Sequence, residues 1–111
     1  MTSKSIQVGS RTYVVKLVDD KTFVETLRSY GTTDNDLIGI KSFINYDEQL
    51  IMINDRLAAD HKRELIFHEL LHAFIEDSGV QLDRVLIEQF VSALAPRMTQ
   101  LFDQIHELTN L

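Results

Sequence analysis

The chain has 111 residues, of which 44% are hydrophobic and 25% charged, with a formal net charge of -6 and no cysteine. This length fits one domain, residues 1–111, with a single core. The acidic balance argues against a nucleic-acid or anionic-membrane partner, since either would normally meet clustered lysine and arginine. The absence of cysteine excludes disulfides, thiolate zinc sites and cysteine nucleophiles. Because no leader pattern or membrane-length apolar run is present, we expect a cytoplasmic protein.

The first part of the chain predicts a small hairpin and then a short helix. Residues 6–8 and 12–18 are rich in β-branched and aromatic side chains, and the turn signal Gly9-Ser10 separates them. Asp19-Asp20 can cap a helix that ends near Gly31 and carries Phe23, Leu27 and Tyr30 at helical spacing. A polar loop is expected over residues 32–36.

Two more strand-like segments occupy residues 37–44 and 49–54, joined by a polar connection of hairpin length. We expect them to pair antiparallel. The second segment is apolar on both faces at residues 50–53, which places it either in the interior of the sheet or at an edge that something else covers.

The rest of the chain predicts two principal helices. The first is apolar on nearly every face over residues 65–75, which predicts a buried helix, and Ser78-Gly79 ends it. The second runs from about Leu82 to the C-terminus, and Pro96 must kink or divide it near residues 92–95. We therefore expect an α+β fold, with a small N-terminal antiparallel sheet packed on the buried helix and on a C-terminal helical region.

The predicted buried helix contains His68-Glu69-Leu70-Leu71-His72, which is the HExxH zinc pattern. Side chains four residues apart on a helix lie one above the other, so both imidazoles can reach one Zn²⁺. Glu69 is offset around the helix and is left to polarise a metal-bound water. Burying these polar groups without partners is costly, which favours metal binding over a pair of core histidines.

A catalytic zinc usually has three protein ligands and one position for water. A third histidine from the HExxHxxGxxH pattern is excluded, because Ile75 and Ser78 stand where that pattern needs Gly and His. The remaining route is a carboxylate from another helix. We expect Glu88, because its apolar neighbours in residues 85–91 suggest a buried stretch of helix. The competing interpretation is that Glu88 belongs to a solvated stripe.

Other residues are weaker candidates for the site. The carboxylates Glu76, Asp77 and Asp83 compete less well, since Glu76 would reach back along its own helix and Asp83 resembles a cap. His61 would lie about 10.5 Å along the helix from His68, too far to share a metal, and His106 is expected at the surface. A tyrosine can donate to an oxyanion, but the sequence assigns that role to none of Tyr13, Tyr30 and Tyr46.

With Glu88 included, the pattern resembles the gluzincin type of zinc metallopeptidase in its smallest form. Residues 63–73, the preceding Ile51-Met52-Ile53-Asn54 and, more loosely, residues 88–91 and 93–96 are similar to small phage and prophage ImmA/IrrE-like metallopeptidases. The resemblance covers about half of the chain. The spacing from His72 to Glu88 is shorter than in large gluzincins, and no Asn-Glu-x-x-Ser-Asp sequence surrounds Glu88.

The resemblance implies a zincin-like fold in which the strand at residues 50–53 lies beside the cleft, where an extended substrate would add main-chain hydrogen bonds. It also implies that His68, His72 and Glu88 hold one Zn²⁺ per chain, with Glu69 as the general base. The expected activity is hydrolysis of peptide bonds in a protein or peptide substrate, in the cytoplasm of a bacterial host cell.

Two rival interpretations remain. In the first, the chain is a non-catalytic zinc-binding protein of phage origin, or a degenerate scaffold, that acts by binding a host partner. A closed four-ligand site would favour this role, whereas an open coordination position would favour chemistry. In the second, the protein is a latent protease whose residues 99–111 occupy its own cleft.

Overall fold

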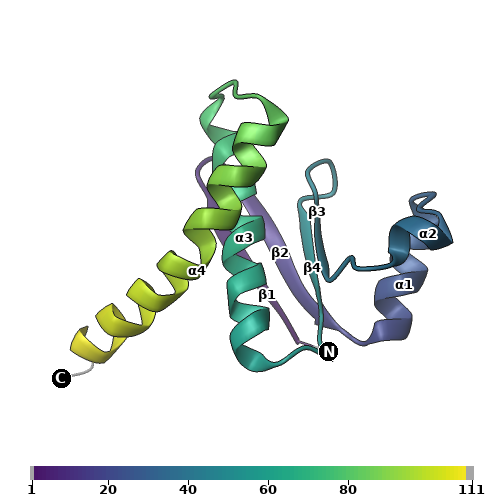
Figure 1. Cartoon of the computed structure of the whole chain (residues 1–111), viewed down its shortest axis with the longest axis horizontal. Helices are drawn as coiled ribbons and strands as arrows, with labels where there is room; N and C mark the ends of the chain where they lie inside the picture. Colours follow the sequence, from purple (N-terminus) through teal and green to yellow (C-terminus); the bar gives the residue numbers. More distant parts are fainter. Residues whose placement is uncertain (1, 110–111) are drawn as a thin grey trace.

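The computed structural model describes residues 2–109, which form one four-stranded sheet and four helices (Figure 1). Along the chain the elements are β1 (Thr2–Val8), β2 (Arg11–Val18), α1 (Asp20–Ser29), α2 (Asp34–Leu37), β3 (Ser42–Asn45), β4 (Leu50–Asn54), α3 (Ala59–Ser78) and α4 (Arg84–Thr109). The predicted α+β class is confirmed. Within residues 2–109 no helix combines the length and the apolar character needed to cross a membrane.

The N-terminal hairpin and the first helix form as predicted. β1 and β2 pair antiparallel around a turn in which Gly9 has a φ of 59°, a conformation that favours glycine. The Asp19 carboxylate caps α1 by accepting a hydrogen bond of 2.8 Å from the backbone N–H of Thr22. The predicted polar loop that follows is partly wrong, because Thr33 caps a single helical turn, α2.

The sheet is mixed, so the predicted purely antiparallel sheet is wrong. Its strand order is β1-β2-β4-β3, in which β4 pairs antiparallel with β3 and parallel with β2. The segment between β2 and β4 contains two helices and β3, which is long enough to return the chain for a parallel pairing. The strand predicted at residues 49–54 is β4. It lies in the sheet interior, which is one of the two positions predicted for it, and β3 is an edge strand.

Apolar side chains on both faces of β4 explain its interior position. Ile51 and Ile53 are fully buried in a core shared with α3, whereas Met52 belongs to a second core with Phe23 and Leu27 of α1. Helices therefore cover both faces of the sheet, and α4 packs outside α3 as a further layer (Figure 1). Such two-sided burial is what a continuous apolar strand requires.

α3 is less buried than predicted, and of the two outcomes predicted at Pro96, a kink or a division of the helix, the division does not occur. Only Glu69 and Ala73 of α3 are buried, and Phe74 is exposed, so this helix is embedded along one face only. Pro96 does not divide α4, which continues to Thr109 although the Ser92 carbonyl loses its helical donor. Contacts with α3 on both sides of Pro96 hold the helix together: Val91 and Ala95 are buried before it, and Phe102 packs against Phe67 after it.

Candidate metal centre

The two motif histidines lie one turn apart on α3 and face the same side. Their ring centroids are 5.0 Å apart, and their side chains are 22% and 15% exposed. This placement follows from the four-residue spacing on a helix. The edges of both imidazoles are therefore accessible from a cleft beside α3 while the rest of each ring is packed.

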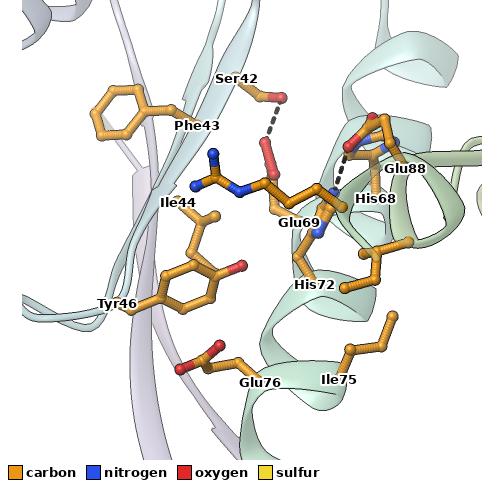
Figure 2. Close-up of a pocket in the computed structure, with 12 residues that line it drawn as sticks. Ser42, Phe43, Ile44, Tyr46, His68, Glu69, His72, Ile75, Glu76 and Glu88 are labelled. Atoms are coloured by element: carbon orange, nitrogen blue, oxygen red, sulfur yellow. Dashed lines mark hydrogen bonds and ion pairs between the residues drawn. The ribbon is translucent and has the colours of Figure 1, made fainter. Parts of the chain in front are cut away.

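Glu88 reaches both histidines from α4. One carboxylate oxygen lies 3.0 Å from Nε2 of His68 and the other lies 3.0 Å from Nε2 of His72 (Figure 2). The helix-to-helix contact that allows this is made by small and apolar residues, with Val91 and Ala95 buried against α3. The structure thus brings together the three residues that the sequence suggested, across two helices.

The burial predicted for Glu88 is nevertheless wrong. Its side chain is 56% exposed, and its neighbours Val85 and Leu86 are 64% and 56% exposed, so this stretch of α4 is not buried. Glu88 lies at the boundary between solvent and the interhelical contact. The solvated-stripe interpretation is correct about its exposure, but the carboxylate still faces the histidines.

Glu69 is the buried acid of the site, with 6% of its surface exposed. Its carboxylate accepts a hydrogen bond of 2.8 Å from the Ser42 hydroxyl, across the cleft on β3 (Figure 2). Burial raises the pKa of Glu69, while the hydrogen bond from Ser42 and the nearby histidines oppose that rise. Ser42 therefore holds the Glu69 side chain and favours its ionised form.

A pocket of about 510 Å³ surrounds these groups between the sheet edge and the two helices. Its lining comes from three places: Ser42, Phe43, Ile44 and Tyr46 in and after β3; His68, Glu69, His72, Ile75 and Glu76 in α3; Arg84, Ile87 and Glu88 in α4. Of the described residues that line it, Arg84 is the only lysine or arginine. Figure 2 shows Ser42 and Tyr46 on the sheet side facing Glu69, His72 and Glu76 on the helix side.

The Tyr46 hydroxyl is a further polar group of this pocket. Desolvation, followed by the charges of Glu76 and Glu69, raises the pKa of Tyr46 to about 12. The phenol therefore keeps its proton throughout the neutral range and can only be a donor to an anion there. Sequence reasoning named Tyr46 together with two other tyrosines, and the fold places it at the site. Tyr30 instead donates a hydrogen bond to Glu48, and Tyr13 is fully buried in the core.

The donor set fits a zinc ion. One ligand atom from each of His68, His72 and Glu88 lies within 4.8 Å of the others. Ligand atoms on a tetrahedral zinc at its usual bond lengths are about 3.4 Å apart. The spacing of 3.0 Å between Nε2 and carboxylate oxygen is a few tenths of an ångström shorter, so a small side-chain rotation is enough to admit the ion.

The other candidate ligands lie elsewhere. Glu76 lines the pocket but does not belong to the donor group, and Asp77 accepts a hydrogen bond of 2.7 Å from the Ser10 hydroxyl. Asp83 caps α4 by accepting from the N–H of Val85 at 2.8 Å, in agreement with the prediction that it is a cap or turn residue. His106 is exposed, as expected, and its ring stacks on Phe102. His61 is half-buried on α3 and is not in the donor group.

Two expectations about the cleft are wrong. The strand at residues 50–53 does not border it, because β3 pairs with the outer side of β4 and supplies the wall itself. Residues 99–109 continue α4, and no described residue beyond Glu88 lines the pocket, so this segment does not occupy the cleft. Residues 110 and 111 of the proposed blocking segment lie outside the described residues.

Comparison of the chain with protein-family models, with curated proteins and with solved structures finds no match.

Proposed function

We propose that this chain is a zinc-dependent peptidase with a zincin-like site, in which His68, His72 and Glu88 hold one zinc ion. The observation that carries the proposal is the convergence of the three donors next to a separate buried carboxylate, Glu69. A structural zinc site needs four ligands and no free acid, whereas a hydrolytic site needs three ligands and a base. Among the described residues, the donor group contains only three members.

When bound, zinc would supply an acidified water and polarise the substrate carbonyl. Glu69 is the residue of this chain that can accept the proton of that water and return it to the leaving amine. The Ser42 hydroxyl holds its carboxylate in place and favours the ionised form that a base requires. Tyr46 retains its proton and lines the same pocket, so its phenol is a donor available to a developing oxyanion.

The substrate is proposed to bind as an extended peptide along β3. This strand is at the sheet edge, and one of its sides lacks a partner strand among the described residues. Ser42, Phe43 and Ile44 of β3 also line the pocket. An added strand would form main-chain hydrogen bonds there and bring its scissile bond past the donor group.

The alternative function is binding of a host partner by a zinc-holding but inactive scaffold. The role of Glu69 distinguishes this alternative from a catalytic site. A purely structural site does not need a buried carboxylate at this position, and burial of the charged form raises its free energy. This cost favours the catalytic role.

The test begins with metal content, measured by mass spectrometry on tag-free protein, because a polyhistidine tag would itself bind zinc. We expect near one zinc per chain. Glu69→Gln should then retain the metal and lose cleavage of an unfolded protein substrate, whereas His68→Ala should lose both. Protein that binds no zinc even when zinc is supplied, or a fully active Glu69→Gln variant, would refute the proposal.

A further inference from the structure

The outer side of α4 carries large apolar side chains that nothing in the described chain covers. Leu86, Phe90, Leu101 and Ile105 are each between 53% and 56% exposed. The α3-facing side of the same helix is formed by Val91 and Ala95, which are buried, so α4 is already anchored without these residues. Exposed apolar area on this scale marks an interaction surface in a soluble protein.

The exposed residues form one stripe. Together with the half-buried Leu94 and Met98 they follow helical spacing along α4, and we call the six residues the apolar stripe: Leu86, Phe90, Leu94, Met98, Leu101 and Ile105. The stripe is about 28 Å long, from the rise of an α-helix. In Figure 1 the end of α4 extends past α3 and the sheet, so its last turns are open to an approaching helix.

Charge on α4 favours a second copy of this chain as the occupant. The chain has a net charge of -6, which opposes self-association in general. The only acidic residues of α4 between Arg84 and Ile105 are Glu88 and Asp103, and both are turned toward α3: Glu88 contacts the two histidines and Asp103 pairs with Arg63. Between residues 89 and 104 the solvent flank of the stripe is formed instead by uncharged residues and one arginine, Gln89, Ala93, Arg97, Gln100 and Gln104, and the exposed Glu107 of α4 follows only after the last stripe residue.

The exposed apolar area of the stripe is also large enough for a stable dimer interface. The four exposed side chains, the half-buried pair and the adjoining Leu82 present roughly 600 Å² of apolar surface, taking large side chains at about 200 Å² each and about half exposed. A standard interface buries about 800 Å² on each partner, a little over half of it apolar. The stripe together with Leu82 therefore meets the apolar requirement of a stable dimer.

We propose that the protein forms a homodimer in which the two α4 helices pack antiparallel about a two-fold axis near residues 95–96. This arrangement places Leu101 and Ile105 of one copy against Phe90 and Leu86 of the other, and the same pairing recurs on the other side of the axis. Ala93, close to the axis, allows the helices to approach. The proposal does not depend on the metal site, which opens on the side of α4 that carries Glu88.

The first experiment is sedimentation equilibrium of the tag-free full-length chain over about 1–100 μM, a range that brackets micromolar dissociation constants. We expect a mass of twice 12.8 kDa at the upper end. Leu101→Glu should weaken the dimer at least tenfold. Ile38→Glu is the matched control, because Ile38 is the most exposed large apolar residue among those whose side chains the structure describes, at 81%, and lies beyond α2 rather than on α4.

A charge-pairing experiment tests the geometry. Phe90→Lys and Leu101→Glu should each be monomeric alone and should associate when mixed, because the antiparallel arrangement places residue 90 opposite residue 101. Circular dichroism of each variant verifies that both are folded.

A wild-type chain that stays monomeric at the highest concentration would overturn the proposal. The apolar stripe would then be a surface for a different protein rather than for a second copy of this chain. A dimer that Leu101→Glu leaves intact would overturn it as well. Folded variants that fail to associate on mixing would overturn the antiparallel pairing. None of these results decides whether the chain binds zinc or cleaves peptides, so this proposal and the proposed function can fail separately.

Discussion

Replacing Glu88 with glutamine is the sharpest test of the metal centre, because it removes one charge and almost no volume. The carboxylate lies 3.0 Å from Nε2 of both His68 and His72, so in the zinc-bound protein it would supply the only negative charge among the three ligands. Residues that merely support zinc ligands typically change metal affinity 10–100-fold when they are altered. Loss of a charged direct ligand should therefore weaken zinc binding at least about 100-fold, or about 2.8 kcal/mol.

The assay is competition for zinc against a chromophoric chelator at neutral pH, with His68→Ala as the reference for a destroyed site. Glu76→Gln is the matched control, since Glu76 lines the same pocket and loses the same charge but lies outside the donor group. We expect Glu76→Gln to change the affinity less than tenfold, through the local field alone. If Glu88→Gln binds zinc as tightly as the wild type, or if the two glutamine variants lose equal affinity, Glu88 is not the third ligand.

Three further predictions concern the partner of Glu69, the Tyr46 phenol and the turn between β1 and β2. Ser42→Ala should lower the cleavage rate about 10–100-fold with little change in zinc affinity. The acid limb of the pH–rate profile should move to higher pH, because the Ser42 hydrogen bond lowers the pKa of Glu69 and its removal lets that pKa rise; an unshifted limb would exclude a positioning role. For metal-free protein, the raised pKa of Tyr46 contributes stability that is complete below pH 10 and is lost as the pH rises toward about 12. Tyr46→Phe should therefore flatten this alkaline loss in urea titrations, and an identical slope in both proteins would contradict the assignment. Gly9→Ala should lower the free energy of unfolding by about 1–2 kcal/mol, because Gly9 has a φ of 59° and an added Cβ would lie 1.7 Å from the Asp77 carboxylate; unchanged urea stability would show that the turn relaxes freely.

The sequence predicts the part of the site that lies on one helix. The helical repeat of α3 alone fixes the relative positions of His68, Glu69 and His72. Their spacing in the sequence is therefore enough to predict their arrangement. The hairpin, the Asp19 cap and the glycine end of α3 were predictable for the same reason, since each depends on residues within a few positions of one another.

Contacts between distant segments were harder to predict. Ser42 was missed because nothing in its neighbourhood distinguishes it, and it meets Glu69 only when β3 becomes the sheet edge beside α3. The parallel pairing of β2 with β4 was missed because local patterns do not record strand order. The only sequence feature related to strand order is the apolar character of β4 on both faces. This feature is compatible with an interior strand, but it does not identify which strands pair with β4.

Glu88 lies beside the two histidines, as expected, although the burial that led to this expectation is wrong. The apolar residues around it suggested burial, but only Val91 is buried there, whereas Val85, Leu86 and Phe90 are exposed. In an amphipathic helix, one apolar stripe usually identifies the core face. α4 has a second apolar side, and the sequence alone cannot tell which of the two faces the core.

This second apolar side connects the two proposals through a single helix. α4 carries both Glu88 and the apolar stripe, so any displacement of α4 from α3 would remove the carboxylate from His68 and His72 and also change the dimer surface. Zinc would favour the docked position of α4, because only that position completes the donor group. If the dimer also requires docked α4, zinc and dimerisation must strengthen each other by the same factor, since coupling between binding equilibria is reciprocal. A dimer dissociation constant that is unchanged by removal of bound zinc would then mean that α4 is fully docked in the metal-free monomer as well, so that α3 and α4 assemble the donor group before zinc binds.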